Sequence, residues 1–318
     1  MSCLKAVSLS LVAISATGLA FTLFSFGIWP LETASLWIPG YLLLASAGAI
    51  GCALSGKFRW SGLGALCAAA SLALLLPHYM LPNRPDVPKV KKNFRVVQAN
   101  VYFPNDDPEP LLRLVRETSP DILLLQEVNE KWIALLKPLE ARYPHHRYSA
   151  RYTNGGMDLA YYWSGETLDV EDLHTEGLPA TAVTLRVNGR TVCFLNVHTA
   201  APFTPERAER YRHQMELLAR RAANRSCPVV VAGDLNAGVW SRHFTALLEQ
   251  GGLVSARRSY GAHGTWPSFF PGSLRIALDH LLVSPGLTVT DCRPGPGIGS
   301  DHLPLITDLN IEQEPHRE

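Results

Sequence analysis

Three long apolar segments in the first third of the chain constrain its fold more than any other feature. They cover Ala6–Trp29, Leu36–Leu54 and Leu63–Leu81, and none contains a charged side chain. Each is close to the ~20 residues that a helix needs to cross the hydrocarbon core of a bilayer. Helices on the surface of soluble proteins carry a polar face, which these segments lack. The first segment is also too long for the core of a signal peptide. We therefore predict a helical anchor over residues 1–82, with about three transmembrane spans.

The charges beside these segments give conflicting signals about membrane orientation. With the N-terminus inside, Lys5, Lys57 and Arg59 lie on the cytoplasmic side, which the positive-inside tendency favours. Five basic residues that closely follow the third segment favour the opposite orientation: Arg84, Lys89, Lys91, Lys92 and Arg95. Because the first helix usually dominates, we favour a multi-pass protein of the cell membrane whose polar domain is extracytoplasmic. The opposite topology stays open.

The rest of the chain has the composition of a soluble α/β domain. Residues 83–93 hold several prolines and charges and are typical of a linker. Beyond them, strand and helix patterns alternate to residue 310, and residues 311–318 form a tail. The predicted strands are Phe94–Ala99, Ile122–Gln126, Asp158–Trp163, Ala182–Val187, Thr191–Val197, Val229–Ala232, Leu278–Val283 and Leu305–Leu309. The predicted helices are Asp107–Thr118, Glu130–Arg142, Pro205–Ala223 and Ser241–Glu249. Asn188–Gly189 is a hairpin signal, so the sheet is mixed.

Polar side chains stand where the predicted apolar strands begin or end. Singly they are weak signals, since an Asn or Asp at a strand end is often a turn residue. Open sheets, however, place functional side chains together at one edge, beyond the strand ends. Carboxylates with few thiols suit a hard cation such as Mg²⁺ or Mn²⁺. The residues are Asn100, Glu127, His198, Asp234, Asn236, Asp279, Asp301 and His302.

The ordered motifs around these residues resemble those of the endonuclease/exonuclease/phosphatase superfamily, which includes deoxyribonuclease I. They are QAN (98–100), LLLQEV (123–128), NVHT (196–199), VVVAGDLN (229–236), ALDHLLVS (277–284) and SDHLPL (300–305). The resemblance covers about Phe94–Leu309. It implies a four-layer α/β sandwich of two mixed β-sheets flanked by helices, here preceded by the transmembrane segments.

The resemblance also implies a role for each residue. Glu127 resembles the primary metal ligand, with Asn100 beside it and Asp301 as a further acid of the metal site. Asp234 resembles the residue that activates the attacking water, and Asn236 the amide that binds the scissile phosphate. His302 resembles the histidine beside the phosphate, held by Asp279. His198 resembles a second catalytic histidine found in some branches of the family. The implied cofactor is Mg²⁺ or Mn²⁺.

One segment departs from the family pattern. Residues 155–162 stand where many members carry a "GxAxxS" strand, and the usual serine is absent. This departure concerns substrate contacts rather than the metal site. Trp266, in another segment common in the family, is interpreted as a packing residue.

The sequence therefore predicts a membrane-anchored, metal-dependent phosphoesterase that hydrolyses phosphodiester or phosphomonoester bonds. The substrate is open between nucleic acid and a phospholipid or inositol-phosphate head group. Outside residues 1–85 the chain carries a net charge of −2, from 25 basic and 27 acidic residues, which disfavours sequence-blind binding of nucleic acid. A catalytically silent membrane receptor or scaffold with the same fold is the alternative. A transporter is disfavoured because no charged residue lies within the apolar segments. Oligomeric state is not predicted.

Overall fold

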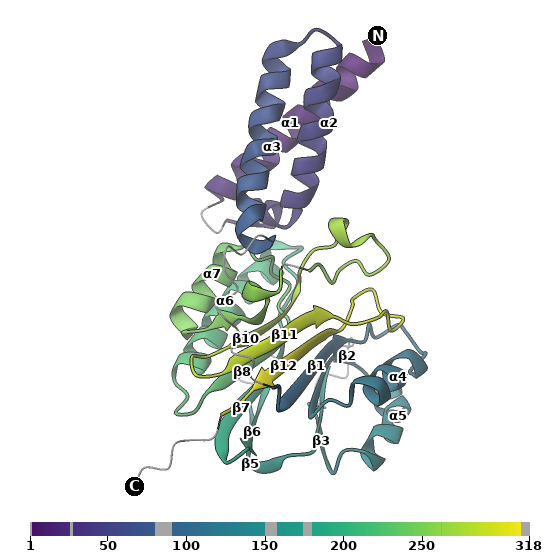
Figure 1. Ribbon diagram of the computed structural model, residues 1–318, viewed down its shortest axis with the longest axis vertical. Coiled ribbons are helices and arrows are strands. Elements are labelled where there is room, and N and C mark those ends of the chain that lie inside the picture. The colour runs from purple at the N-terminus through teal and green to yellow at the C-terminus, as the bar shows by residue number, and fades with distance from the viewer. Residues whose placement is uncertain are drawn as a thin grey trace.

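The computed structural model of this chain describes residues 2–25, 28–79, 91–149, 158–173, 180–261 and 263–312. A bundle of three helices stands on one end of an α/β domain (Figure 1). The greater part of the linker predicted at 83–93, and residues 155–157 of the departing segment, lie outside the described residues.

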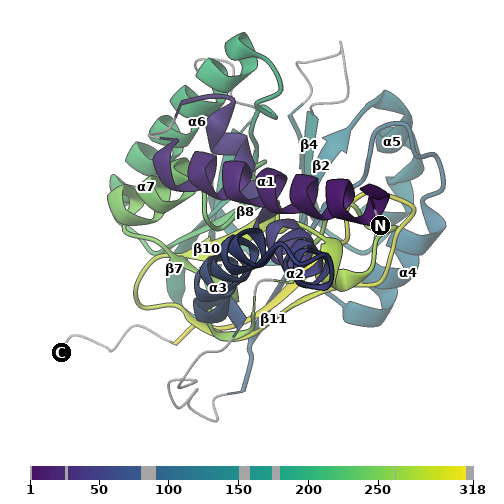
Figure 2. The ribbon, with the colours of Figure 1, turned by 90° about the horizontal axis from the view of Figure 1, so that it is seen from above.

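The bundle consists of α1 (Ser2–Phe24), α2 (Ile38–Leu54) and α3 (Phe58–Tyr79). Three segments are long and apolar enough to cross a membrane: Cys3–Phe24, Leu31–Leu54 and Phe58–His78. Seen from above, α1 lies beside α2 and α3 and is tilted relative to both of them (Figure 2). Small residues allow the close approach, since a Cβ at Gly48 would lie 2.8 Å from Val12 Cγ2.

The first helix is shorter than its predicted apolar segment. It ends at Phe24, and a 3₁₀ helix, η1 (Leu31–Trp37), then leads into α2. The apolar segment therefore continues in the sequence beyond the end of the helix, as far as Trp29. The Trp29 indole instead donates a hydrogen bond to the carbonyl of Pro202 in the α/β domain.

The α/β domain contains two six-stranded sheets. Sheet A has the order β11-β12-β1-β2-β4-β3, and sheet B has the order β5-β6-β7-β8-β10-β9. In sheet A the strands are β1 (Phe94–Asn100), β2 (Ile122–Val128), β3 (His145–Tyr148), β4 (Asp158–Trp163), β11 (Thr288–Pro294) and β12 (Leu305–Asn310). In sheet B they are β5 (Glu166–Asp172), β6 (Ala180–Val187), β7 (Arg190–His198), β8 (Val229–Asp234), β9 (Val254–Ser255) and β10 (Asp279–Val283).

The two sheets pack face to face, and helices cover their outer faces. The core between the sheets joins Val96, Leu124 and Tyr161 of sheet A to Phe194 and Val230 of sheet B. A second core packs α6 (Pro205–Ala223) and α7 (Arg242–Gly251) on sheet B, and a third packs α4 (Glu109–Thr118) and α5 (Glu130–Leu135) on sheet A. The predicted four-layer sandwich is confirmed.

One predicted helix is interrupted. Residues 130–142 form α5 and then a separate 3₁₀ helix, η2 (Lys137–Ala141). Pro138 lacks the amide hydrogen that a continuous helix would use, and its ring disfavours helical backbone at the residue before it.

The strand directions bring the polar strand ends to one edge of the sandwich. The pairs β1–β2 and β7–β8 are parallel, so their carboxyl ends point the same way. β10 is antiparallel to β8, and β12 is antiparallel to β1, so both begin at that same edge. The residues at the carboxyl ends of β1, β2, β7 and β8 therefore lie close to those at the start of β10 and β12. The helical bundle stands above this edge of the sandwich (Figure 1).

Candidate active site

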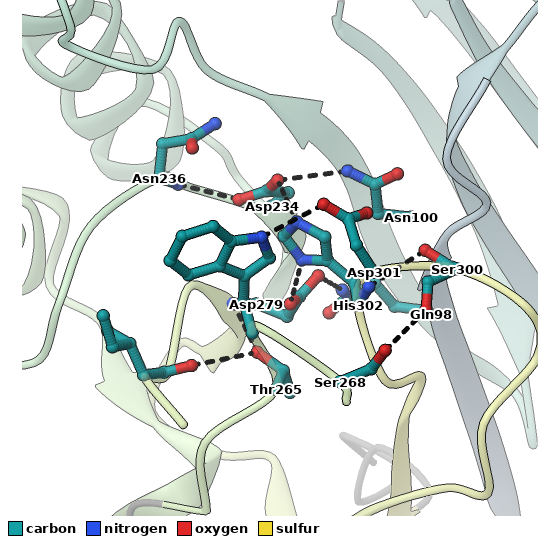
Figure 3. Close-up of polar contacts among 12 residues, drawn as sticks. Gln98, Asn100, Asp234, Asn236, Thr265, Ser268, Asp279, Ser300, Asp301 and His302 are labelled. Carbon is teal, nitrogen blue, oxygen red and sulfur yellow. Dashed lines mark hydrogen bonds and ion pairs between the residues drawn. The ribbon is translucent and has the colours of Figure 1, made fainter. Parts of the chain in front are cut away.

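Eight predicted residues gather at this edge between the two sheets. Figure 3 shows Asn100, Asp234, Asn236, Asp279, Asp301 and His302 among them. Asn100 ends β1, Glu127 lies near the end of β2, His198 ends β7 and Asp234 ends β8. Asn236 follows two residues later, Asp279 begins β10, and Asp301 and His302 precede β12.

Asn100 joins the carboxylates of the two sheets. Its Nδ2 lies 2.9 Å from Glu127 Oε1 and 3.2 Å from Asp234 Oδ2, so the amide donates to both. Its carboxamide oxygen accepts from the backbone N–H of Tyr102 at 2.9 Å. In this orientation Asn100 holds the two carboxylates in place. Its role as a metal ligand stays a prediction.

Two residues of the site have left-handed backbone conformations. Glu127 has φ of 59° and lies at an irregularity between β2 and β4, while Asn236 has φ of 46°. Side chains other than glycine adopt this region rarely, and such strain concentrates at functional sites. The bulge breaks the alternation of β2 and so directs the Glu127 side chain toward the edge.

His302 and Asp279 form a buried pair. His302 Nδ1 lies 2.8 Å from Asp279 Oδ2, and the other ring nitrogen lies 3.7 Å from Asp234 Oδ2. Burial alone would lower the pKa of His302, but the carboxylates of Asp279 and Asp234 outweigh it and raise this pKa to about 10. The same imidazole holds the pKa of Asp279 below its usual value, against the effect of burial.

Asp234 is in a different environment from Asp279. Its carboxylate is almost fully buried, and burial raises its pKa, in spite of the nearby imidazoles of His302 and His198. Asp234 Oδ1 accepts from the backbone N–H of Asn236 at 2.9 Å. The two buried carboxylates are thus shifted in opposite directions, a pattern typical of catalytic sites.

His198 ends β7 of sheet B and, like His302, lies near the carboxylate of Asp234. Its Nε2 is 3.9 Å from Glu127 Oε1 and 3.7 Å from Asp234 Oδ2. Its other ring nitrogen is buried and finds no hydrogen-bond partner among the described residues. Asn236 Nδ2 donates to the carbonyl of Thr199 at 2.9 Å, which orients the carboxamide at the side of the cleft.

Asp301 lies at the rim of the cluster. Its Oδ2 accepts from the indole N–H of Trp266 at 3.1 Å, and its Oδ1 is buried without a partner in the described part of the chain. Trp266 therefore orients an acid of the site in addition to packing.

The donor set fits a divalent cation. Ligand atoms of Glu127, His198 and Asp234 all lie within 4.8 Å of one another, and Asp301 offers an unpartnered oxygen nearby. Within the described ranges, no lysine or arginine forms an ion pair with Glu127 or Asp234. Two neighbouring carboxylates repel each other, and a bound cation would relieve that repulsion. Oxygen donors with one imidazole are suited to magnesium or manganese.

The structure adds supporting residues that the sequence analysis did not select. Gln98 Nε2 donates to Asp279 Oδ1 at 2.7 Å, and Ser300 Oγ accepts from the His302 backbone N–H at 3.0 Å. Gln98 is fully buried within β1. A glutamine inside an apolar strand was the available signal, because a buried amide requires a partner.

The cluster opens into a cleft of about 580 Å³. Glu127, His198, Asp234, Asn236 and His302 form its floor. Its opposite wall comes from the segment between the first two helices, with Trp29, Pro30, Thr33, Leu36 and Trp37.

Most of the α/β domain matches the profile of a known protein family. The profile described as the Endonuclease/Exonuclease/phosphatase family matches residues 97–302. No curated protein matches this chain.

Solved structures share the fold at low sequence identity. An endonuclease/exonuclease/phosphatase from Beutenbergia cavernae DSM 12333 is 19% identical with a TM-score of 0.56, over 70% of this chain and 72% of that one. TDP2 from D. rerio, complexed with a single strand DNA product, is 14% identical with a TM-score of 0.55, over 68% and 98%. The 3′ phosphatase NExo from Neisseria, bound to a product DNA hairpin, is 20% identical with a TM-score of 0.54, over 69% and 100%.

Proposed function

This chain belongs to the endonuclease/exonuclease/phosphatase family, and on that basis we propose that it is a membrane-anchored, divalent-metal-dependent phosphoesterase. Residues 1–82 are the anchor and residues 94–310 the catalytic domain. The substrate is a phosphodiester or a phosphomonoester, for which nucleic acids and phospholipid or inositol-phosphate head groups are the candidate classes. The protein spans the cell membrane several times, with the catalytic domain on the extracytoplasmic side.

The meeting of Glu127, Asp234 and the Asp279–His302 pair in one cleft is the observation that carries this proposal. A structural role alone does not require an acid with left-handed backbone beside a second, buried acid. These groups suit the hydrolysis of a phosphoester, which is accelerated by a base for water and by positive charge around the phosphate.

Each residue of the site has its own role in the reaction. Asp234, whose Oδ1 accepts from the backbone N–H of Asn236, takes a proton from the attacking water. His302, oriented by Asp279, donates to a phosphoryl oxygen as negative charge grows there. Asn236 binds a second phosphoryl oxygen, and His198 supplies a proton to the leaving oxygen.

Glu127 would hold the divalent ion, together with Asn100 and Asp301. When bound, the ion supplies positive charge that stabilises the transition state and the leaving oxygen. The ion is Mg²⁺ or Mn²⁺.

Hydrolysis of bis(p-nitrophenyl) phosphate by the full-length protein in detergent tests the proposal. Activity is measured with magnesium, with manganese and with chelator. We expect metal-dependent release of nitrophenol, reduced by about 10²–10⁴-fold in Asp234→Asn, because the base is lost. In Glu127→Gln the metal concentration for half-maximal rate should rise.

Two exposed acids give matched controls. Glu130→Gln lies at the start of α5, three residues from Glu127, and Asp169→Asn lies on the edge strand β5. Both should retain full activity. A folded protein that hydrolyses neither this diester nor nitrophenyl phosphate would instead support the alternative, a silent membrane receptor or scaffold.

A further inference from the structure

The catalytic cleft is shared between the α/β domain and the membrane anchor. Trp29 and Trp37 line it from the anchor, and Glu127 and His302 line it from the two sheets. Its position is therefore tied to the ends of the helices that are apolar enough to cross a membrane. In Figure 1 the helices rise from the same edge of the sandwich at which the polar strand ends meet.

Hydrogen bonds fix the anchor on the domain. Glu32 is 8% exposed, and its Oε1 accepts from the backbone N–H of Arg242 at 2.6 Å. The indole of Trp240 donates to the carbonyl of Leu74 in α3 at 3.0 Å. Together with the Trp29 bond to Pro202, these contacts join α3 and the segment between α1 and α2 to the domain. The cleft is therefore held at a fixed position relative to the helices.

Tryptophans at the two ends of the bundle indicate where the surfaces of the membrane lie. Trp29, Trp37 and Trp240 lie at the domain end of the bundle, and Trp60 lies near the start of α3 at the far end. Tryptophan is enriched at the two membrane–water interfaces. α2 has 17 residues and so spans about 25 Å, close to the thickness of the hydrocarbon core. The cleft, beside Trp37, thus lies at the level of lipid head groups.

Exposed apolar side chains surround the cleft on this side. Phe203 is 70% exposed and lines the cleft. Phe269 is 74% exposed, and Phe270 and Leu274 are also exposed. These three belong to the segment that carries η5 (Gly272–Leu274), which packs against α2. Large exposed apolar groups that adjoin membrane-spanning helices are typical of a surface that contacts lipid.

The charge of the cleft disfavours a polyanion. Among the described residues, its lining includes one arginine, Arg207, and no lysine, with the imidazoles of His198 and His302, against the acids Glu127, Asp234 and Asp301. Binding along a nucleic acid requires several cations, each of which neutralises a phosphate. One guanidinium beside an apolar rim is suited to a single phosphate whose substituents are partly apolar.

We infer that the substrate is a bilayer phospholipid, whose head-group phosphodiester enters the cleft while its acyl chains stay in the membrane. This inference rests on the proposed phosphoesterase function and names its substrate class. Water adds to phosphorus, the P–O bond to one alcohol breaks, and one proton of the water passes to the departing alcohol. The products are a phosphate monoester and an alcohol, and no co-reactant is needed. The segment Phe269–Leu274 inserts into the interface and holds the cleft against it.

Full-length protein in vesicles of phosphatidylcholine, phosphatidylethanolamine and phosphatidylglycerol tests this inference. Products are identified by phosphorus NMR and mass spectrometry, with bis(p-nitrophenyl) phosphate and a single-stranded oligonucleotide as soluble comparators. We expect metal-dependent conversion of at least one phospholipid, at a higher rate than the oligonucleotide. The double variant Phe269→Ser/Phe270→Ser should lower phospholipid hydrolysis by about ten-fold or more, because two apolar contacts with the bilayer are lost. Both residues lie outside the cleft lining, so diester hydrolysis should stay within about two-fold of wild type.

Leu168→Ser/Val170→Ser is the matched control, since both residues are exposed on the edge strand β5, at the opposite end of the domain from the anchor helices α1, α2 and α3 (Figure 1). It should change neither rate. A second readout is the tryptophan fluorescence of the variants Phe269→Trp and Leu168→Trp in vesicles with brominated acyl chains. Only the tryptophan introduced in Phe269→Trp should be quenched by the bromine atoms.

Four results separate the two proposals. Metal-dependent cleavage of the soluble diester with no phospholipid product overturns the lipid inference alone. Faster cleavage of the oligonucleotide than of lipid, or equal quenching of the two tryptophans, also overturns it. Failure to cleave any of these substrates overturns the phosphoesterase function itself.

Discussion

The carboxylate of Asp279 lies 2.8 Å from Nδ1 of His302, and both side chains are buried. Asp279 begins β10 of sheet B, whereas His302 precedes β12 of sheet A. The contact therefore crosses the interface between the sheets. It requires the two sheets to pack in one relative position, so that the fold of the whole sandwich fixes the orientation of one imidazole.

Asp279→Asn should abolish most of the activity and keep the fold. An asparagine fills the same space, but it removes the charge that stabilises and orients the imidazolium. We expect kcat for bis(p-nitrophenyl) phosphate to fall by about 10²–10⁴-fold. Circular dichroism of the purified variant should match wild type. A rate within about two-fold of wild type would remove Asp279 from the mechanism.

Gln98→Met tests a residue that acts through Asp279. Gln98 donates to the second carboxylate oxygen, and methionine has a similar volume without the donor. We expect kcat to fall by about ten-fold while KM changes little, because substrate does not touch Gln98. Equal changes in kcat and KM, or a loss of folding, would assign Gln98 a different role.

The central strands were predictable because their physical signal is strong. β1, β2, β7, β8, β10 and β12 are buried on both faces, so each appears in the sequence as an apolar segment, and their polar ends are conspicuous. For the same reason the site residues could be named before their positions were known. The parallel and antiparallel pairings that bring them together were not visible in the sequence.

The edge strands were missed for the opposite reason. β3 and β11 lie at the two edges of sheet A, and β5 and β9 lie at the edges of sheet B. They have one partner each and are largely exposed or only partly buried, as in the sequence ETLDVED of β5. Charged residues on edge strands prevent aggregation but remove the periodic pattern that identifies a strand. The wall that the anchor contributes to the cleft was likewise not predictable, since it depends on tertiary contacts of Trp29 and Glu32.

Stability should rise with pH between about pH 4 and 6.5 because of His280. Burial, with the charge of Arg257, lowers the pKa of His280 to about 4, although Asp279 acts in the opposite direction. In this window the unfolded chain binds a proton that the folded chain does not, so protonation favours unfolding. The contribution is complete above pH 6.5 and is lost as pH falls, by up to about 3 kcal/mol.

His280→Gln should flatten this dependence. His280 Nε2 bonds to the carbonyl of Ala237 at 2.8 Å, and a glutamine amide can donate the same bond without titrating. The measurement is thermal unfolding of both proteins in detergent with chelator at pH 4.5, 5.5 and 7. Parallel curves for the two proteins would exclude His280 as the group responsible.

Gly233→Ala should be far more damaging than Gly252→Ala. Gly233 has φ of 149°, and a Cβ there would lie 1.8 Å from the carbonyl oxygen of Val197 on β7. Gly252 follows α7 as its C-cap, with φ of 61° and open space around it. We expect Gly252→Ala to lose about 1 kcal/mol through backbone strain alone, and Gly233→Ala more than about 3 kcal/mol or to fail to fold. Unfolding midpoints of the two variants give the comparison, and equal losses would contradict the clash.

Glu32→Ala should loosen the anchor from the catalytic domain. The Glu32 carboxylate accepts from the first backbone N–H of α7, at Arg242, and from Ser25 Oγ at 3.0 Å. It therefore caps a helix of the domain from a residue of the anchor, and its negative charge suits a helix N-terminus. Loss of this cap should destabilise the protein by about 1–2 kcal/mol, or about 2–6 °C in Tm.

The same variant tests whether the anchor wall belongs to the working cleft. Glu249→Ala, an exposed acid near the end of α7, is the matched control and should leave Tm within about 1 °C. If the wall formed by Trp29 and Trp37 positions substrate, Glu32→Ala should raise KM more than it lowers kcat, because it displaces the wall and leaves Glu127, Asp234 and His302 in place. A lower Tm with unchanged KM would mean that Glu32 stabilises the junction without shaping the cleft.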